Sequence, residues 1–320
     1  MKCKSLLAST ATLAAALLVA SLPPSPAQTP VCTAGDINCD GRPDILWRNR
    51  STGSNAVWYM GGATHLDDAG LPDEPNLDWQ IGGTGDFDGD SRIDIVWRNR
   101  STGQNVAWSL SEDEDDGNID SYEPLPLPAE TDTNWRVVAT GDFDGNGRSD
   151  LVWQNQSNGQ VRFWLLNGTA LVGVLPLGTE SDLNWQIVGS GDFDADGRPD
   201  LFWRNRATGQ VRLWYVTGST FTSSGPLQQV ENLNWDVAGV GDFARLAGGA
   251  VVGEPDGRPD VLWRHALTGE NALWVMQGTT VVSTAYLPQV LSTVALETTE
   301  GLSSTPQTPT TASPWAAVAR

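Results

Sequence analysis

The chain has 320 residues and carries 39 acidic against 19 basic side chains, so its formal net charge at pH 7 is −20. Such an acidic chain is a poor partner for nucleic acids and anionic membranes, which are recognised through clustered Lys and Arg. The sequence has two histidines and no Gly-x-x-x-x-Gly-Lys phosphate loop, so it offers no recognisable catalytic arrangement.

The first 27 residues have the pattern of a secretory signal peptide, which is removed from the mature protein. Lys2 and Lys4 give a positive start, residues 6–20 are apolar, and residues 25–27 offer a small-residue cleavage site. The apolar stretch is too short for a spanning helix, and no later run approaches ~20 apolar residues. We therefore expect a secreted, periplasmic or cell-surface protein without membrane insertion.

Two cysteines remain if the chain is cut after Ala27. The cut removes Cys3 and leaves Cys32 and Cys39 as an even pair in an oxidising compartment. The pair predicts a small disulfide that clips the first acidic loop to the segment before it. The alternative is two unpaired, small apolar side chains.

The nine-residue run from Asp142 to Asp150 (DFDGNGRSD) recurs along the chain and is typical of a calcium loop. Positions one, three, five and nine offer side-chain oxygens, position six is a glycine for a sharp turn, and the backbone carbonyl of position seven can face inward. Ca²⁺ takes six to eight such oxygen ligands, with waters completing the shell. No glutamate follows at position twelve and the flanks read as strands, so the loop is not an EF-hand.

Four copies of this loop are close to intact, and in each the position-seven arginine would contribute its carbonyl. They are Asp36, Asn38, Asp40, Arg42 and Asp44; Asp86, Asp88, Asp90, Arg92 and Asp94; Asp142, Asp144, Asn146, Arg148 and Asp150; and Asp192, Asp194, Asp196, Arg198 and Asp200. The second copy has Ser91 in place of the position-six glycine, so its turn is the least certain. We expect four Ca²⁺ sites here.

A fifth copy is interrupted by the inserted residues 244–253. Asp242 opens it, Asp256 and Asp260 close it, and Glu254 is the best substitute at position three, so metal binding is open here. A single acidic loop can be an Asx-rich turn without metal, but turn chemistry does not demand an aspartate at position nine every time. The five loops contribute 17 aspartates to the 39 acidic residues, and divalent cations would neutralise them there.

Each loop begins a unit of about fifty residues, a period typical of propeller blades. The units start near residues 35, 85, 141, 191 and 241. In each unit the loop leads into a short apolar strand that ends in tryptophan, then a glycine-containing hairpin turn, and then a strand with a second tryptophan. A variable stretch follows, and a third tryptophan opens the strand that runs into the next loop. The three series are Trp47, Trp97, Trp153, Trp203 and Trp263; Trp58, Trp108, Trp164, Trp214 and Trp274; and Trp79, Trp135, Trp185, Trp235 and Trp315.

Four short strands per unit and no helical period predict an all-β fold, a β-propeller of about five four-stranded blades in one domain over residues 28–320. A β-solenoid is a distant second, because its repeats are shorter. After a Ser/Thr/Pro-rich insertion at about 292–314, residues 315–320 could complete the first blade and close the ring. Residues 31–35 also look like that strand, so both could pair there or one could hang free. The alternative to five blades is a larger ring formed by association, but we expect a monomer.

The units resemble the FG-GAP/VCBS repeat family, which carries the same Gly-Asp-Phe-Asp-x-Asp-Gly-x-x-Asp-Leu pattern. The resemblance covers residues 31 to about 288. It implies a β-propeller like the head of integrin α chains, with Ca²⁺ bound by the loop aspartates and asparagines given above. The family has no single function: its members are adhesion or ligand-binding modules, lectin-like domains, or propellers attached to secreted enzymes.

The tryptophans and a recurrent Trp-Arg-Asn triplet can each have either a structural or a ligand-binding role. The tryptophans favour blade packing, with the second series as the best candidate for exposed platforms against which sugars stack. The triplet arginine could bridge blades and its asparagine could bond the turn, or the triplets could form a repeated polar ligand site.

We expect a secreted, Ca²⁺-stabilised propeller that binds an extracellular glycan or protein without catalysis. One alternative is a secreted enzyme with its site near the irregular fifth unit or the acidic insertion 112–120. The other is a structural surface-assembly protein. His65 and His265 lack a partner of the kind that catalysis would need.

Overall fold

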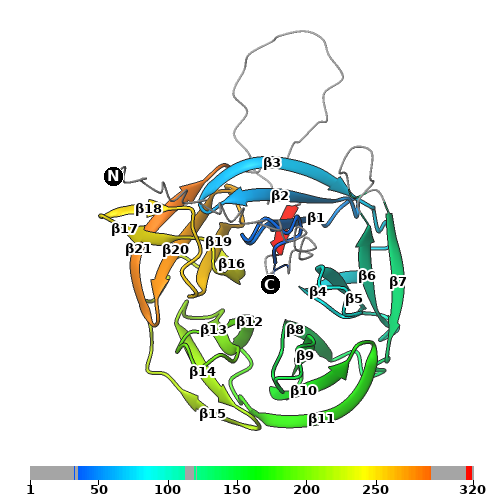
Figure 1. Ribbon diagram of the computed structural model, residues 1–320. Coiled ribbons are helices and arrows are strands. Elements are labelled where there is room, and N and C mark those ends of the chain that lie inside the picture. Colours follow the sequence, from blue (N-terminus) through cyan, green and yellow to red (C-terminus); the bar gives the residue numbers. More distant parts are fainter. Residues whose placement is uncertain (1–31, 33–34, 112–118, 120, 290–314, 319–320) are drawn as a thin grey trace, which may run out of the picture. The chain divides into compact units, whose positions relative to one another are not determined.

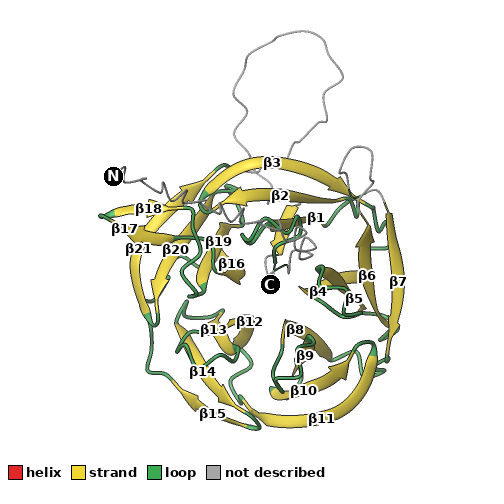
Figure 2. Ribbon diagram, viewed as in Figure 1, coloured by secondary structure: helices red, strands yellow, loops and turns green. Residues whose placement is uncertain are grey.

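The computed structural model describes Cys32 and residues 35–111, 119, 121–289 and 315–318, all within one compact unit that spans residues 31–320. The expected signal peptide (1–27), the Ser/Thr/Pro-rich segment (292–314) and all but Ile119 of the acidic insertion lie outside the described residues. Every regular element in the described part is a strand (Figure 2). None of it is therefore a helix long and apolar enough to span a membrane.

Five four-stranded antiparallel sheets are arranged as blades around a centre (Figure 1). From the innermost strand outward, blade 1 contains β22 (Trp315–Val318), β1 (Ile45–Asn49), β2 (Asn55–Gly61) and β3 (Thr64–Leu71). Blade 2 contains β4 (Trp79–Gly85), β5 (Asp94–Asn99), β6 (Asn105–Ser111) and β7 (Ser121–Leu127). Blade 3 contains β8 (Trp135–Gly141), β9 (Asp150–Asn155), β10 (Gln160–Asn167) and β11 (Ala170–Thr179).

Blade 4 contains β12 (Trp185–Gly191), β13 (Asp200–Asn205), β14 (Val211–Thr217) and β15 (Thr220–Ser223). Blade 5 contains β16 (Trp235–Gly241), β19 (Asp260–His265), β20 (Asn271–Gln277) and β21 (Thr280–Leu287). The insertion at 244–253 forms a separate hairpin of β17 (Arg245–Ala247) and β18 (Ala250–Val252). The predicted all-β propeller is thus confirmed, with five blades.

The burial of each strand depends on its position in the blade, from the innermost strand to the outermost. The second strands β5, β9, β13 and β19 are buried at every residue, because neighbouring blades cover both of their faces. The outermost strand β11 instead alternates between exposed and half-buried residues, as a strand with one solvent face does. The innermost strands of blades 2 to 5 all shift register at their third to fifth residues, as between Ile81 and Gly83.

Hydrophobic packing lies between blades rather than within them. Each of the five core clusters draws its buried side chains from two adjacent blades. Val57 of blade 1 and Ile95 of blade 2 share one cluster, and Ile45 of blade 1 and Leu262 of blade 5 share another. No blade can therefore bury its apolar faces alone, and the core is continuous around the ring.

Blade 1 is built from both ends of the described chain. β22 pairs antiparallel with β1, with Ala317 opposite Trp47, and supplies the innermost strand. Of residues 31–35, the other candidate for this strand, Cys32 and Gly35 are described and neither lies in a strand.

Cation–π contacts connect successive blades around the ring. The first-series tryptophans are at most 2 % exposed, and each packs against the second tryptophan of its own blade. On the other side lies the triplet arginine of the preceding blade, at 4.7 to 5.2 Å from the ring centroid: Arg48 over Trp97, Arg98 over Trp153, Arg204 over Trp263 and Arg264 over Trp47. Such contacts contribute about 2 kcal/mol when desolvated. The triplet arginine therefore does bridge blades.

Blade 3 has Gln154 in the arginine position, and its amide instead bonds the backbone of Trp185 and Ile187 in blade 4. The triplet asparagine holds the turn, as when Asn49 Oδ1 accepts hydrogen bonds from the backbone N–H groups of Ser51 and Thr52. Four of the five second-series tryptophans do not form open platforms: Trp108, Trp164, Trp214 and Trp274 are at most 7 % exposed, because the outer strands and neighbouring blades cover them, and Trp58 is half-buried.

Removing residues 315–320 should lower the free energy of unfolding, because β1 would lose its inner partner strand. The expected result is a fall in the thermal midpoint of about 2–4 °C for each kcal/mol lost. Adding a peptide of residues 311–320 to the truncated protein should recover part of the midpoint. An unchanged midpoint after truncation would contradict the role of β22 in closing the ring.

Candidate metal centres

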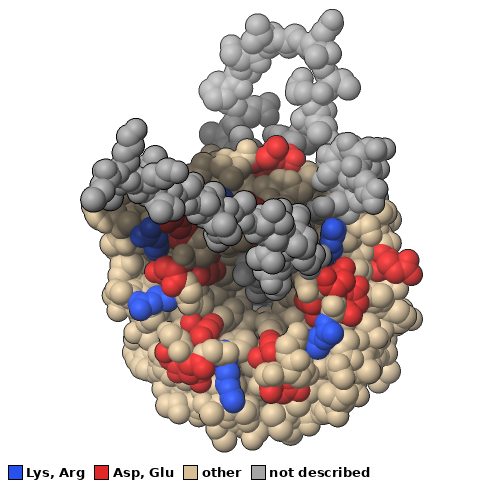
Figure 3. Space-filling model, in the orientation of Figure 1, with Lys and Arg blue, Asp and Glu red and all other residues tan. Residues whose placement is uncertain are grey.

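The acidic loops all lie at the same end of the blades. In blades 2 to 5 the loop follows the innermost strand and leads into the second strand, as from Gly85 to Asp94, and in blade 1 it precedes β1. On the face of the ring drawn in Figure 3, acidic side chains gather in separate clusters around the centre.

The position-one aspartate organises the backbone of each loop. Asp142 Oδ1 accepts hydrogen bonds from the backbone N–H groups of Gly145 (2.7 Å) and Asn146 (3.1 Å), and its Oδ2 accepts one from Gly147 (2.8 Å). The bond from position six recurs in the other four loops, from Gly41 to Asp36, Ser91 to Asp86, Gly197 to Asp192 and Gly257 to Asp242. All five loops thus share the same turn around position one.

Left-handed backbone occurs at positions four and six of the four intact loops. In the third loop these are Gly145 and Gly147, with φ of 78° and 79°. Ser91 takes the same conformation with φ of 70°, so the turn of the second loop forms despite its missing glycine. The fifth loop has Pro255 at position four, and its ring excludes a positive φ.

The position-nine aspartate ties three chain segments together. Asp150 is fully buried; its Oδ2 accepts a hydrogen bond from Phe143 N in the loop (2.9 Å), and its Oδ1 accepts one from Leu166 N on β10 (2.8 Å). The equivalent residues Asp44, Asp200 and Asp260 bond the loop and the third strand in the same way. Asp94 Oδ2 bonds Phe87 N, whereas its buried Oδ1 has no hydrogen-bond partner among the described residues.

Burial makes the ionised form of these aspartates costly. It raises the pKa of Asp44 and of Asp94 to about 7, of Asp150 and of Asp200 to about 6, and of Asp260 to about 8, from an ordinary 3.8. Backbone N–H bonds oppose this effect, and neighbouring loop carboxylates add to it. A bound cation would favour the ionised form, because an opposite charge close by lowers a carboxyl pKa.

Carboxylates converge in three of the loops. Within the described part of the chain, three trios each place their ligand atoms within 4.8 Å of one another: Asp86, Asp88 and Asp90; Asp142, Asp144 and Asp150; and Asp192, Asp194 and Asp200. Hard oxygen donors at this spacing suit Ca²⁺. The clusters are able to hold a metal ion.

In the first loop, the position-three and position-five oxygens of Asn38 and Asp40 accept bonds from the backbone of Asp40 and Arg42. The disulfide between Cys32 and Cys39 is present and attaches position four of this loop to the preceding segment. Cys32 N also donates to Ser91 O, so the bridge links the first loop to the second.

The fifth loop is assembled from distant pieces. Asp242 Oδ1 accepts a hydrogen bond from Asp256 N, and Asp260 occupies the buried position nine. Glu254, the substitute expected at position three, pairs with Arg245 on the inserted hairpin, with Oε2 2.5 Å from Nη2. The insertion therefore gives Glu254 a partner outside the loop.

Position-seven arginines have side-chain contacts that the sequence did not reveal. Arg148 Nη1 lies 3.7 Å from Asp86 Oδ2 in the loop of the adjacent blade, and Arg42 Nε donates to Gly253 O beside the fifth loop. Their guanidinium groups reach from one loop to the next, so neighbouring loops are coupled in charge.

The FG-GAP-like repeat family matches residues 86–153 and 142–203, so the chain carries FG-GAP-like repeats over 86–203 and the predicted resemblance is confirmed. No curated protein matches the chain.

Many solved structures are similar to it, and three of them are described here. They are a protein of unknown function from Bacteroides caccae (9 % identity, covering 76 % of this chain and 72 % of that chain, TM-score 0.38), a nidogen/laminin complex (11 %, 77 % and 93 %, 0.43), and a putative 6-phosphogluconolactonase from Bacteroides uniformis (11 %, 76 % and 81 %, 0.36). Their low TM-scores carry no argument about the function of this chain.

Without metal, the protein should lose stability as pH rises from about 4 to about 8. The unfolded chain releases an aspartate proton near its ordinary pKa of 3.8, whereas the folded pKa values of about 6 to 8 keep the proton at Asp150, Asp44 and Asp260. Below pH ~4 the raised pKa of each aspartate makes its full contribution to the free energy of unfolding. Between pH 4 and 8 this contribution falls by up to about 1.4 kcal/mol per group and pH unit.

The measurement is the urea midpoint of metal-stripped protein at pH 5, 6, 7 and 8. Asp150→Asn should show a shallower decline than wild type, and Asp67→Asn, at an exposed position of β3, should follow wild type. A midpoint that rises with pH across this window would contradict the burial argument.

Proposed function

We propose that this FG-GAP-like propeller is a secreted, monomeric, non-catalytic module that binds an extracellular glycan or protein, with Ca²⁺ stabilising its blades. The observation that supports it best is the convergence of three carboxylate trios, each in a loop with the same backbone turn. Repulsion within each trio opposes folding until a cation neutralises it, so the free energy of metal binding becomes free energy of folding.

The position of the loops supports a structural role for the metal. Each loop joins the first two strands of its blade or leads into β1, and in blades 1, 3, 4 and 5 its position-nine aspartate also bonds the third strand. A metal at these oxygens would hold three strands in register. Extracellular calcium modules bind with dissociation constants of about 0.1 to 1 mM, so occupancy would follow the calcium concentration outside the cell.

Both histidines have contacts within their own blades. His65 packs against Trp58 with ring centroids 4.5 Å apart, and its Nε2 lies 3.7 Å from Asp68 Oδ1. His265 Nδ1 accepts a hydrogen bond from Thr268 N, in the place where other blades use the triplet asparagine. Each histidine thus has a structural contact that accounts for it.

Calcium should raise the thermal midpoint. Each site adds about 2.7 kcal/mol to the free energy of unfolding when the calcium concentration reaches 100 times the dissociation constant. Asp144→Ala and Asp194→Ala each remove one exposed oxygen from a trio and should weaken the response, most strongly when combined. Asp67→Ala removes the same charge from β3 and should leave the response unchanged. Equal midpoints in calcium and in chelator would overturn the structural role of calcium.

The calcium-loaded protein should retain at least one extracellular ligand. A glycan array and a panel of extracellular matrix proteins, followed by tryptophan fluorescence titration of each hit, would identify it. Light scattering after size-exclusion chromatography should give the mass of one chain. Silence in every binding assay together with a polymeric product would favour the surface-assembly role instead.

A further inference from the structure

A cavity of about 720 Å³ opens at the centre of the ring, at the end of the blades opposite to the acidic loops. β4 shows the arrangement: Gln80, opposite Arg98, lines the cavity, and the other end of the same strand pairs with Asp94 of the second loop. A seven-residue strand spans roughly 20 Å, so cavity and loops are well separated. The cavity is therefore distinct from the candidate metal centres.

Seven arginines line this cavity in a chain whose net charge is −20. The acid among the described lining residues is Asp236. Apart from Lys2 and Lys4, every basic residue of the chain is an arginine, so the cavity carries a large share of the protein's positive charge. Burial lowers the pKa of Arg98 to about 10, and the charge of Arg136 adds to this effect.

Two of the seven arginines, Arg48 and Arg98, are committed to the fold. Their guanidinium groups donate to the carbonyls of Gly53 and Gly103 and to the side chains of Asn55 and Asn105, besides the cation–π contacts described above. They line the cavity but have few donors left for a ligand.

Three others, Arg50, Arg100 and Arg206, are exposed and follow directly on the triplet asparagines. Within the described part of the chain, no hydrogen bond or ion pair engages their guanidinium groups. Arg136 uses one nitrogen, Nη1, on Thr133 O. These four side chains hold the donors that are available to a ligand.

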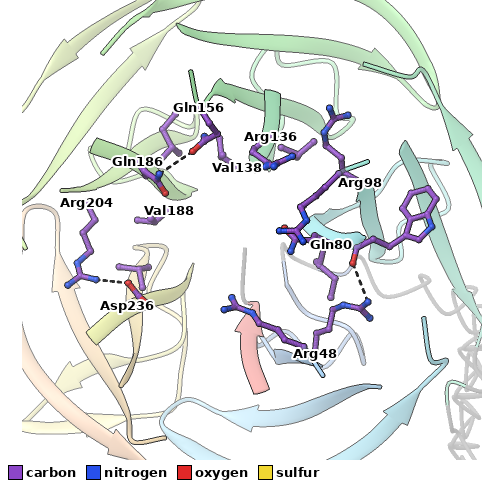
Figure 4. Close-up of a pocket in the computed structure, with 18 of the residues that line it drawn as sticks. Arg48, Gln80, Arg98, Arg136, Val138, Gln156, Gln186, Val188, Arg204 and Asp236 are labelled. Carbon is purple, nitrogen blue, oxygen red and sulfur yellow. Dashed lines mark hydrogen bonds and ion pairs between the residues drawn. The ribbon is translucent and has the colours of Figure 1, made fainter. Parts of the chain in front are cut away.

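Arg204 differs from the other triplet arginines because its blade has Val211 where blades 1, 2 and 5 have asparagine. Without that amide, Nη1 of Arg204 turns to Asp236 at 2.9 Å (Figure 4), and its buried Nε and Nη2 have no hydrogen-bond partner among the described residues. The side chain is 2 % exposed. The ion pair with Asp236 therefore holds this buried guanidinium at the cavity wall.

The rest of the wall suits hydroxyl groups. Gln156 and Gln186 bond each other at 3.1 Å across blades 3 and 4 and keep an amide donor and an acceptor for other groups (Figure 4). Val138 and Val188 add apolar surface between these polar side chains. The volume lies in the range of small-molecule sites, about 300 to 1,000 Å³.

We propose that this cavity binds a small molecule or chain end that carries two or more oxyanion groups beside hydroxyls, of the class of acidic sugars. Guanidinium groups match carboxylate and sulfate oxygens with paired, charge-assisted hydrogen bonds. The inference rests on the proposed ligand-binding role and names the chemical class of the ligand. Arg50, Arg100, Arg136 and Arg206 would bind its charges, and Gln156 and Gln186 its hydroxyls.

Calorimetry on the calcium-loaded full chain tests this inference. The probes are trigalacturonate, citrate and inorganic sulfate, with maltotriose as the neutral control. We expect trigalacturonate to bind at least 10-fold more tightly than maltotriose, and to weaken as salt is raised. Arg50→Gln, Arg100→Gln and Arg206→Gln should each weaken binding several-fold, and the triple variant should abolish it. Arg245→Gln, an arginine of the inserted hairpin, removes the same charge outside the cavity and should leave affinity unchanged.

The outcomes separate the cavity from the wider ligand-binding role. Citrate or sulfate could bind while trigalacturonate does not. If the triple variant then loses this binding, the cavity is an anion site for a free small oxyanion. Failure of all three anions to bind would overturn the inference. So would a triple variant that keeps both the wild-type affinity for the anions and the wild-type thermal midpoint. If another glycan or a protein still binds that variant, the ligand-binding role stands and the cavity is not its site.

Discussion

The buried position-nine aspartate is the constraint on which the blades depend. In blades 1, 3, 4 and 5 its two oxygens accept hydrogen bonds from the backbone of the loop and of the third strand. The aspartate itself is the first residue of the second strand or directly precedes that strand. A carboxylate fixes this geometry well, but burial makes its charge expensive unless a proton or a cation accompanies it. The same residue therefore sets the register of the blade and makes its stability depend on what the solvent supplies.

Aspartates connect the strands within a blade, whereas arginines connect neighbouring blades. The triplet arginines lie over tryptophans of the next blade, and position-seven arginines such as Arg148 reach the neighbouring acidic loop. Planar guanidinium groups stack on aromatic rings while they donate to carbonyls, which lysine cannot do. Carboxylates thus gather in the loops at one end of the ring, and seven arginines gather around the cavity at the other end.

Much of this fold could be predicted from the repeats. The spacing of loop, tryptophan and glycine turn gives the number of blades and their strands, since each feature recurs in phase. Local pattern also predicts the disulfide between Cys32 and Cys39. The choice of β22 as the closing strand could not be made, because pairing with β1 depends on tertiary contacts that no local pattern encodes.

Two features of the sites were also beyond local reasoning. Glu254 was expected in the fifth loop, but its carboxylate meets Arg245, a contact that forms only once the insertion folds as a hairpin. The central arginines were missed because Arg50, Arg100 and Arg206 belong to three different units and come together only when the ring closes. The signal was present in the basic residue that follows the triplet asparagine in three of the five units.

The pairing of β22 with β1 also bears on how the chain reaches its native state. Arg48 and Ala316 are partners although 268 residues separate them, so blade 1 cannot be completed until nearly the whole sequence is available. Non-local pairing of this kind has a large loop-closure entropy and slows folding. During synthesis blades 2 to 5 can form in order, while blade 1 keeps the inner edge of β1 open. Docking of this one strand completes the ring, and while it is absent the open edge of β1 is where a second chain could add by mistake.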